Sequence, residues 1–77
     1  MTKDEFFREL ETLIEAPSGS IRGDEALMDL AGWTSLAVIS FIAMTDEKLG
    51  VTAGATDIAQ CKSVADLVRL FPGKIDG

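Results

Sequence analysis

Apolar side chains recur at intervals of three and four residues along much of this chain, and no stretch alternates apolar with polar residues as a half-buried strand would. Intervals of three and four place side chains on one face of an α-helix. The first such segment covers residues 3–15, where Thr2 and Glu5 have the spacing of a capping box. Its apolar stripe consists of Phe6, Phe7, Leu10, Leu13 and Ile14. The sequence therefore predicts helices rather than a sheet.

The charged residues of this first segment are expected to lie mainly on a solvated face of the helix. Asp4 and Arg8 are four residues apart and are predicted to form an ion pair along the helix surface. The remaining charges, all expected in solvent, are Lys3, Glu5, Glu9, Glu11 and Glu15.

A second helix is predicted to begin at Ser35, a residue type favoured at helix N-caps, and to run to Leu49. Gly50 then fits a left-handed C-cap. The first three turns of this helix, residues 36–44, carry no charge. We expect the core-facing side to include Val38, Phe41, Ile42, Thr45 and Leu49. The opposite side would then expose an apolar patch around Leu36, Ala37, Ser40, Ala43 and Met44.

A long loop, residues 17–34, separates the two helices. We expect Leu27, Met28 and Leu30 to pin this loop to the core, with one short turn after Asp24. Trp33 is expected to pack at the end of the loop; a contact with a partner is the alternative.

The last part of the chain predicts two further helices. Residues 56–60 have room for a short helix with Ile58 as its inward anchor. Ser63 then caps a final helix that ends at Leu70 or Phe71, before the Pro-Gly pair. The predicted fold is all-α: one domain over residues 1–77, a small bundle of three main helices plus one short helix, with a long loop between the first and second helices.

Composition excludes several classes of function. The chain has no histidine and one cysteine, Cys61, which we expect to be a small, partly buried apolar residue. We therefore predict no catalytic residues, no metal site and no internal disulfide. With 7 Lys+Arg against 13 Asp+Glu, the net charge of −6 disfavours nucleic acid as a partner. No segment is apolar over the about 20 residues of a membrane span, and no secretory signal is recognisable, so a reduced cytoplasmic setting is expected.

The run Asp-Leu-Ala-Gly-Trp-Thr-Ser-Leu at residues 29–36 resembles the attachment site of acyl and peptidyl carrier proteins. The signature of that family is Asp-Ser-Leu after a Gly-containing loop, at the start of the second helix, and the subset with Gly-Trp-Asp-Ser-Leu is the most similar. The resemblance extends along nearly the whole chain, through its length, its acidity, the long first loop, Leu-Gly-Val at residues 49–51 and Ser-Val-Ala-Asp-Leu at residues 63–67.

This resemblance implies that Ser35 is esterified with 4′-phosphopantetheine by a phosphopantetheinyl transferase that uses coenzyme A. The thiol of that arm carries acyl cargo as a thioester to acyl-transferring or synthase enzymes, so the chain needs no catalytic residue of its own. We expect a specialised, free-standing carrier of a lipid or polyketide-type pathway. One alternative is that Ser35 only caps its helix. A related one is an unmodified, carrier-shaped interaction module that docks a partner through the apolar second helix.

Two departures from the family pattern concern the surface around Ser35. Thr34 replaces the usual aspartate, and the interval from Leu30 to Ser35 is one residue longer than in the commonest form. Fatty-acid carriers also show acidic residues early in the second helix, whereas this chain has no charge there. We therefore expect partners to bind a mainly apolar surface of a monomeric carrier, with a dimer contact as the alternative. That expected surface comprises Thr34, Leu36, Ala37, Ser40, Met44, Asp46 and Glu47.

Overall fold

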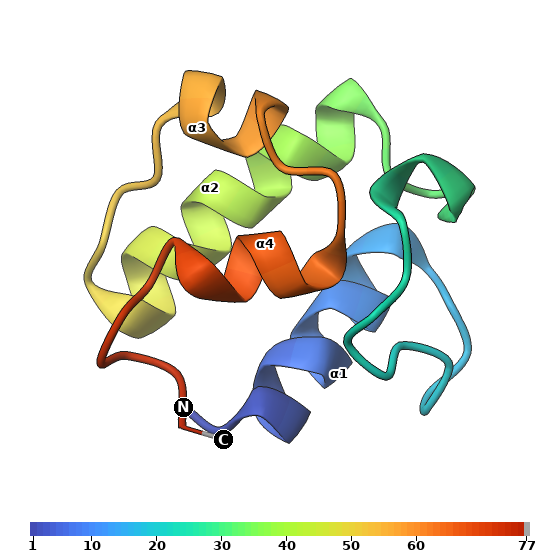
Figure 1. Ribbon diagram of the computed structural model, residues 1–77, viewed down its shortest axis with the longest axis horizontal. Coiled ribbons are helices and arrows are strands. Elements are labelled where there is room, and N and C mark those ends of the chain that lie inside the picture. The colour runs from blue at the N-terminus through green and yellow to red at the C-terminus, as the bar shows by residue number, and fades with distance from the viewer. Residues whose placement is uncertain (77) are drawn as a thin grey trace.

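Four α-helices and one turn of 3-10 helix form the fold in a computed structural model, which describes residues 1–76 (Figure 1). The helices are α1 (Lys3–Ile14), α2 (Ser35–Leu49), α3 (Ala55–Ala59) and α4 (Val64–Arg69), and the turn η1 (Leu27–Asp29) lies in the long loop. Within residues 1–76 the only extended pairings are two isolated bridges, Thr2 with Asp76 and Ala26 with Ser63. The predicted all-α bundle with a long first loop is confirmed.

Side-chain caps fix where the helices begin. At the start of α1, the Thr2 hydroxyl accepts a hydrogen bond from the Glu5 N–H at 3.1 Å, and the Glu5 carboxylate accepts one from the Thr2 N–H at 2.9 Å. Ser63 and Asp66 make the same reciprocal pair at the start of α4, at 3.2 Å in each direction. These capping boxes satisfy backbone N–H groups that have no partner inside the helix, as the sequence predicted.

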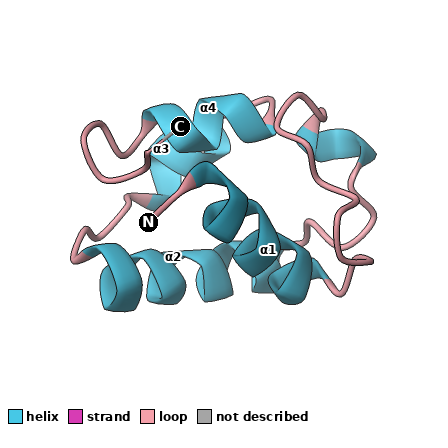
Figure 2. Ribbon diagram, turned by 90° about the horizontal axis from the view of Figure 1, so that it is seen from below, coloured by secondary structure: helices cyan, strands magenta, loops and turns pink. Residues whose placement is uncertain are grey.

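Three phenylalanines join the helices at the centre of the molecule. Phe6 of α1, Phe41 of α2 and Phe71 after α4 are each at most 2% exposed. Their ring centroids lie 5.9 Å (Phe6–Phe41), 6.2 Å (Phe6–Phe71) and 6.0 Å (Phe41–Phe71) apart. In Figure 2, α2 runs along one side of the molecule and α4 lies on the opposite side. This aromatic cluster therefore sets the positions of α1, α2 and α4 relative to one another.

The described ends of the chain lie side by side (Figure 1). The Lys3 N–H donates to the Asp76 carbonyl at 2.7 Å, and the Asp76 N–H donates to the Met1 carbonyl at 2.8 Å. Because these bonds fasten the segment after α4 to the start of α1, the last residues described belong to the folded unit.

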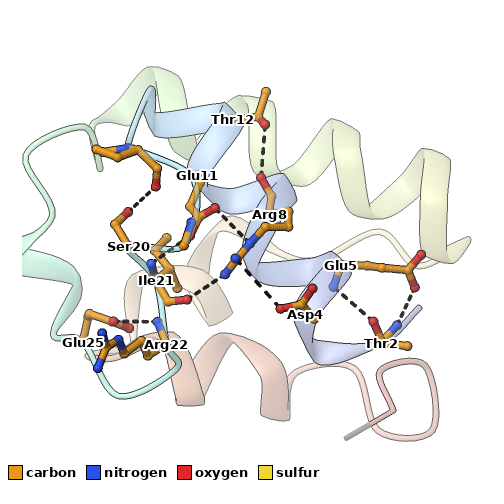
Figure 3. A network of polar contacts seen from close by, with 12 residues as sticks. Thr2, Asp4, Glu5, Arg8, Glu11, Thr12, Ser20, Ile21, Arg22 and Glu25 are labelled. Atoms are coloured by element: carbon orange, nitrogen blue, oxygen red, sulfur yellow. Dashed lines mark hydrogen bonds and ion pairs between the residues drawn. The ribbon is translucent and has the colours of Figure 1, made fainter.

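One charged side chain of α1, that of Glu11, is buried, so the prediction that it lies in solvent is wrong. Glu11 is 2% exposed, and its Oε2 accepts hydrogen bonds from the N–H groups of Gly19 at 3.0 Å and Ile21 at 2.8 Å. Its Oε1 lies 2.9 Å from Arg8 Nε in an ion pair, and Arg8 also donates to the Ile21 carbonyl at 3.0 Å (Figure 3). The loop turns these N–H groups toward α1, where water is excluded, and such groups need an acceptor. Glu11 supplies it and fastens the loop.

Two of the three side chains expected to fasten the long loop do so, and one does not. Leu27 is buried and Leu30 half-buried, as predicted, but Met28 is 91% exposed. The reason is the three-residue period of the 3-10 turn, which places Leu27 and Leu30 on the same side and Met28 on another. Ile21, 1% exposed, is the loop anchor that the sequence analysis missed.

Candidate attachment site

Ser35 is the first residue of α2, and its side chain is exposed. The prediction that Ser35 is the N-cap is therefore wrong by one residue. The N-cap is Thr34, which has extended backbone angles and whose Oγ1 accepts a hydrogen bond from the Ala37 N–H at 3.3 Å. The cap interaction therefore does not use the hydroxyl of Ser35.

The start of α2 favours a negatively charged group. The first N–H groups of a helix have no intrahelical partner, and the helix dipole adds partial positive charge there. Thr34 engages only the N–H of Ala37 by its side chain, and the first turn of α2 contains no acidic residue. The absence of a neighbouring carboxylate means that a phosphodiester on Ser35 would meet no repulsion from this turn. The residues present thus fit a phosphate ester at this position.

The segment before Ser35 is held by packing and by backbone hydrogen bonds. Trp33 meets the ring of Phe41 edge-on, with centroids 5.8 Å apart and planes at 74°, and its N–H donates to the Leu30 carbonyl at 3.0 Å. The expectation that Trp33 packs at the end of the loop is confirmed. Gly32 lies directly against the end of α1, since a Cβ there would fall on the carbonyl oxygen of Ile14. These contacts give the start of α2 a fixed position.

The seven residues expected on the partner-binding surface separate into exposed and buried groups. Those exposed are Thr34, Leu36, Asp46 and Glu47, and Ser40 is half-buried. Ala37 and Met44 are 4% and 7% exposed, so the expected exposure of these two side chains is wrong. The reason is the helical period, because Ala37, Phe41, Met44 and Thr45 follow intervals of four, seven and eight and form one core-facing stripe.

Ile39 is an exposed residue of α2 that the sequence analysis missed. It is 64% exposed, and the nearby Leu36 is 72% exposed. Together with exposed Ala43, these residues lie at intervals of three and four on one solvent-facing stripe, which we call the α2 apolar stripe. The same intervals in the sequence could have identified Ile39. Val38 and Ile42, expected in the core, are half-buried beside it.

Met28 extends this exposed apolar character to the loop. Among residues 1–76, the large apolar side chains that are exposed are Met28, Leu36 and Ile39. In the view of Figure 1, η1 and the start of α2 lie toward the same end of the molecule. Large exposed apolar side chains are typical of a binding surface rather than of a solvated one.

The single cysteine is not placed for nucleophilic chemistry. Cys61 is half-buried, as expected, and its Sγ lies 3.4 Å from the Asp57 carbonyl as a donor. Burial raises the pKa of the Cys61 thiol, and the charges of Asp66 and Asp57 raise it further. The thiol is therefore held in its protonated, less reactive form.

Neither a membrane-spanning helix nor a metal-binding cluster is found among the described residues. None of the helices within residues 1–76 combines the length and the apolarity that crossing a membrane requires. In the same part of the chain, no group of three or more His, Cys, Asp or Glu side chains is arranged to bind a metal ion.

Comparison with known proteins identifies the family. The model of the family described as "Phosphopantetheine attachment site" matches residues 5–71, which is most of the chain and includes all of α2, α3 and α4. Searches of curated proteins and of solved structures gave no significant match. Members of this family are carriers that bear 4′-phosphopantetheine as a covalently bound group. Because the family model matches far more than half of this chain, the chain belongs to the phosphopantetheine attachment site family of acyl carrier domains.

Proposed function

We propose that Ser35 is the residue that receives 4′-phosphopantetheine, and that the protein carries acyl intermediates on this arm as thioesters. The observation that carries the proposal is the division of roles at the start of α2. Thr34 caps the helix, while the exposed hydroxyl of Ser35 is left available one residue later. A serine that served only as a cap would be expected at the position of Thr34.

The residues around Ser35 would act by position and by charge rather than by catalysis. The arm supplies the thiol to which the acyl group is attached. The start of α2 stabilises the negative phosphodiester, and the packing of Trp33 on Phe41 keeps its first turn in place. We expect the transferase to remove the proton of the Ser35 hydroxyl, because the chain has no histidine and the first turn of α2 has no carboxylate to accept it.

The proposed partner surface is the α2 apolar stripe together with Met28. Asp46 and Glu47, both exposed, border it toward the C-terminal end of α2. Partners would be a phosphopantetheinyl transferase and acyl-transferring or synthase enzymes. Because the stripe carries no charge, we expect association to depend weakly on salt, in contrast to electrostatically steered complexes. This apolar surface favours a dedicated lipid or polyketide-type pathway.

A monomeric state and a cytoplasmic location complete this proposal. A carrier must present the same surface to several enzymes in turn, which a permanent dimer through α2 would prevent. The supply of coenzyme A to the transferase fits a cytoplasmic setting. Sedimentation of the purified protein over a range of concentrations tests the first point, and fractionation of cells tests the second.

A second candidate function is an unmodified interaction module. The observation in its favour is Thr34, because the family signature has an aspartate before the serine. In that case the α2 apolar stripe would dock a partner without the arm.

One experiment distinguishes the two candidates. The purified protein is incubated with coenzyme A and a broad-specificity phosphopantetheinyl transferase, and its intact mass is measured. We expect a gain of one phosphopantetheinyl group, which Ser35→Ala should abolish and Ser18→Ala, a control at an exposed serine of the long loop, should leave unchanged. A gain that persists in Ser35→Ala would contradict the assignment of Ser35. Folded protein that gains no mass with several transferases would favour the unmodified module.

A further inference from the structure

A small hollow of about 240 Å³ lies between the start of α1, the loop at Gly23 and α4. Its residues differ from those of the α2 apolar stripe and of the segment that holds Ser35. Four of its lining residues are uncharged, namely Phe7, Gly23, Ala65 and Val68. The other three are the cationic residues Lys3, Arg22 and Arg69. We call this feature the cationic hollow.

The cationic hollow concentrates positive charge in an acidic protein. Three of the seven Lys and Arg residues line it, and no lining residue is acidic, although the net charge is −6. By contrast, Arg8 is paired with Glu11 on α1, and Lys48 with Glu9. The hollow is therefore a local exception to the charge of the whole molecule.

The nearby carboxylates are already engaged. Asp66 lies 2.6 Å from Arg69, an exposed pair of the kind that contributes little, and Arg69 remains 72% exposed. The Glu25 carboxylate accepts hydrogen bonds from the N–H groups of Arg22 at 2.7 Å and Gly23 at 2.9 Å. Within residues 1–76, no carboxylate lies within the 4.0 Å ion-pair distance of the side chains of Lys3 or Arg22. Among the described residues neither cation therefore has an ion-pair partner, although the Glu25 carboxylate is close enough to interact with the charge of Arg22.

The apolar part of the lining depends on the close approach of the loop at Gly23 to Phe7 of α1. Gly23 has a left-handed φ of +117°, and a Cβ there would come within 2.9 Å of the Phe7 ring. Only glycine lets the loop backbone lie this close to Phe7 without strain. Phe7 and Val68 stay half-buried and present apolar surface between the cations.

We propose that the cationic hollow is a second docking site, which takes an apolar side chain flanked by carboxylates on a partner protein. The volume of about 240 Å³ is below the about 300–1,000 Å³ of typical small-molecule sites, which favours a single anchoring side chain. Flanking carboxylates would pair with Lys3, Arg22 and Arg69, while the acidic remainder of the protein would repel them. An acidic partner therefore binds in one orientation. Such a partner holds the carrier while Ser35 and the α2 apolar stripe stay free for another enzyme.

The test uses the Ser35→Ala protein, so that its result does not depend on loading of the arm. The probe is the capped peptide Asp-Glu-Leu-Phe-Asp-Glu, titrated into ¹⁵N-labelled protein, with Asn-Gln-Leu-Phe-Asn-Gln as the neutral comparison. We expect the amide shifts of Phe7, Gly23 and Val68 to change with the acidic peptide. The double variant Lys3→Glu/Arg22→Glu should weaken binding by about tenfold or more.

A matched control separates local pairing from net charge. Lys48→Glu/Lys74→Glu changes the total charge by the same amount at residues outside the hollow, and it should change the affinity by less than about twofold. The neutral variant Lys3→Gln/Arg22→Gln should give an intermediate affinity. This variant still tests the proposal if Lys3→Glu/Arg22→Glu does not fold.

Three results would overturn the proposal. One is a set of shifts centred on Leu36 and Ile39 instead of the hollow. Another is an equal loss of affinity in the hollow and control variants. The third is that the acidic peptide does not bind, whereas decanoate binds in a way that depends on Lys3 and Arg22. The hollow would then be a site for a small amphiphilic anion.

Discussion

The Oγ1 atom of Thr34 accepts a hydrogen bond from the N–H of Ala37 at 3.3 Å, which makes Thr34 the N-cap of α2. Threonine and aspartate both cap helices by accepting this type of bond. Replacement of the family's aspartate by Thr34 therefore keeps the cap and removes a negative charge beside Ser35. We therefore expect this difference to affect recognition by a transferase more than it affects the fold.

Capping and attachment can be separated by two substitutions. Thr34→Ala removes the cap of α2 and should lower the free energy of unfolding by about 1 kcal/mol. Ser35→Ala should change it by less than about 0.5 kcal/mol, because Ser35 is exposed and alanine is a good helix former. Urea unfolding followed by the fluorescence of Trp33 measures both. A larger loss in Ser35→Ala than in Thr34→Ala would mean that Ser35 has the structural role.

The buried carboxylate of Glu11 should be the main polar support of the long loop. Glu11→Gln replaces one acceptor oxygen by a donor group facing Arg8 or the loop N–H groups. We expect a loss of about 2–3 kcal/mol, below the about 3–5 kcal/mol for fully buried pairs because the Arg8 side chain is 36% exposed. Amide hydrogen exchange should show lower protection at Gly19 and Ile21.

The control for this prediction is Glu9→Gln on the same helix. Glu9 pairs with Lys48 at 3.3 Å near the surface, so its loss should cost less than about 1 kcal/mol. Equal losses for the two variants would show that the contacts of Glu11 do not fasten the loop.

Gly32 is a position in the loop where a side chain would meet backbone. The Cβ of Gly32→Ala would fall on the Ile14 carbonyl oxygen and lie 2.7 Å from the Ile14 Cβ. Because α1 backbone cannot move aside as a side chain can, we expect destabilisation by about 3 kcal/mol, measured by differential scanning calorimetry. Gly54→Ala is the control, since its nearest neighbour is the flexible end of Asp57 at 3.3 Å. A similar melting temperature for both variants would contradict the close approach.

The hydrogen bonds of Glu25 predict a contribution to stability that is lost in acid. Burial raises the pKa of Glu25, but the N–H groups of Arg22 and Gly23 outweigh this effect, so the pKa lies below its ordinary value. Near the unfolded-state pKa of about 4.3, the unfolded chain then binds more protons than the folded one. The contribution is therefore fully present above that pH and is lost as the pH falls through the lower folded-state value.

The variant Glu25→Gln measures this contribution. Its free energy of unfolding should fall less steeply than that of the parent protein as the pH is lowered from about 5 to 3. Urea titrations at several pH values give the two slopes. Parallel slopes would show that Glu25 has the same pKa in both states.

The helices were predictable because their determinants are local. Apolar intervals of three and four, the capping boxes at Thr2 and Ser63, and the C-cap at Gly50 all act within a few residues. The burial of Glu11 was not predictable, since it depends on loop N–H groups eight and ten residues away that reach α1 only after folding. The short turn after Asp24 was predicted and is confirmed as η1, but the sequence did not indicate that its three-residue period turns Met28 toward solvent.

The candidate site was predictable in place but not in detail. The residues around Ser35 indicated the start of the second helix, whereas Thr34 and Ser35 are both good caps and the sequence could not decide between them. The surface of α2 was harder still to predict, because residues 36–44 carry no charge that would mark the solvent side of the helix. The rotation of α2 is set by the contacts of Phe41 with Phe6 and Phe71, which come from distant parts of the chain.

This rotation leads to a prediction that separates docking from stability. Leu36→Gln/Ile39→Gln changes two exposed residues of the α2 apolar stripe, so the fold should remain stable while the kcat/KM of a transferase falls by about tenfold. Met44→Gln places a polar group in the core, at a residue 7% exposed, and should cost about 2 kcal/mol of stability. Well below its melting temperature, the Met44→Gln protein should be loaded at the parental rate within about twofold. The opposite pattern, with loading impaired in Met44→Gln and normal in the double variant, would place the docking surface on the other side of α2.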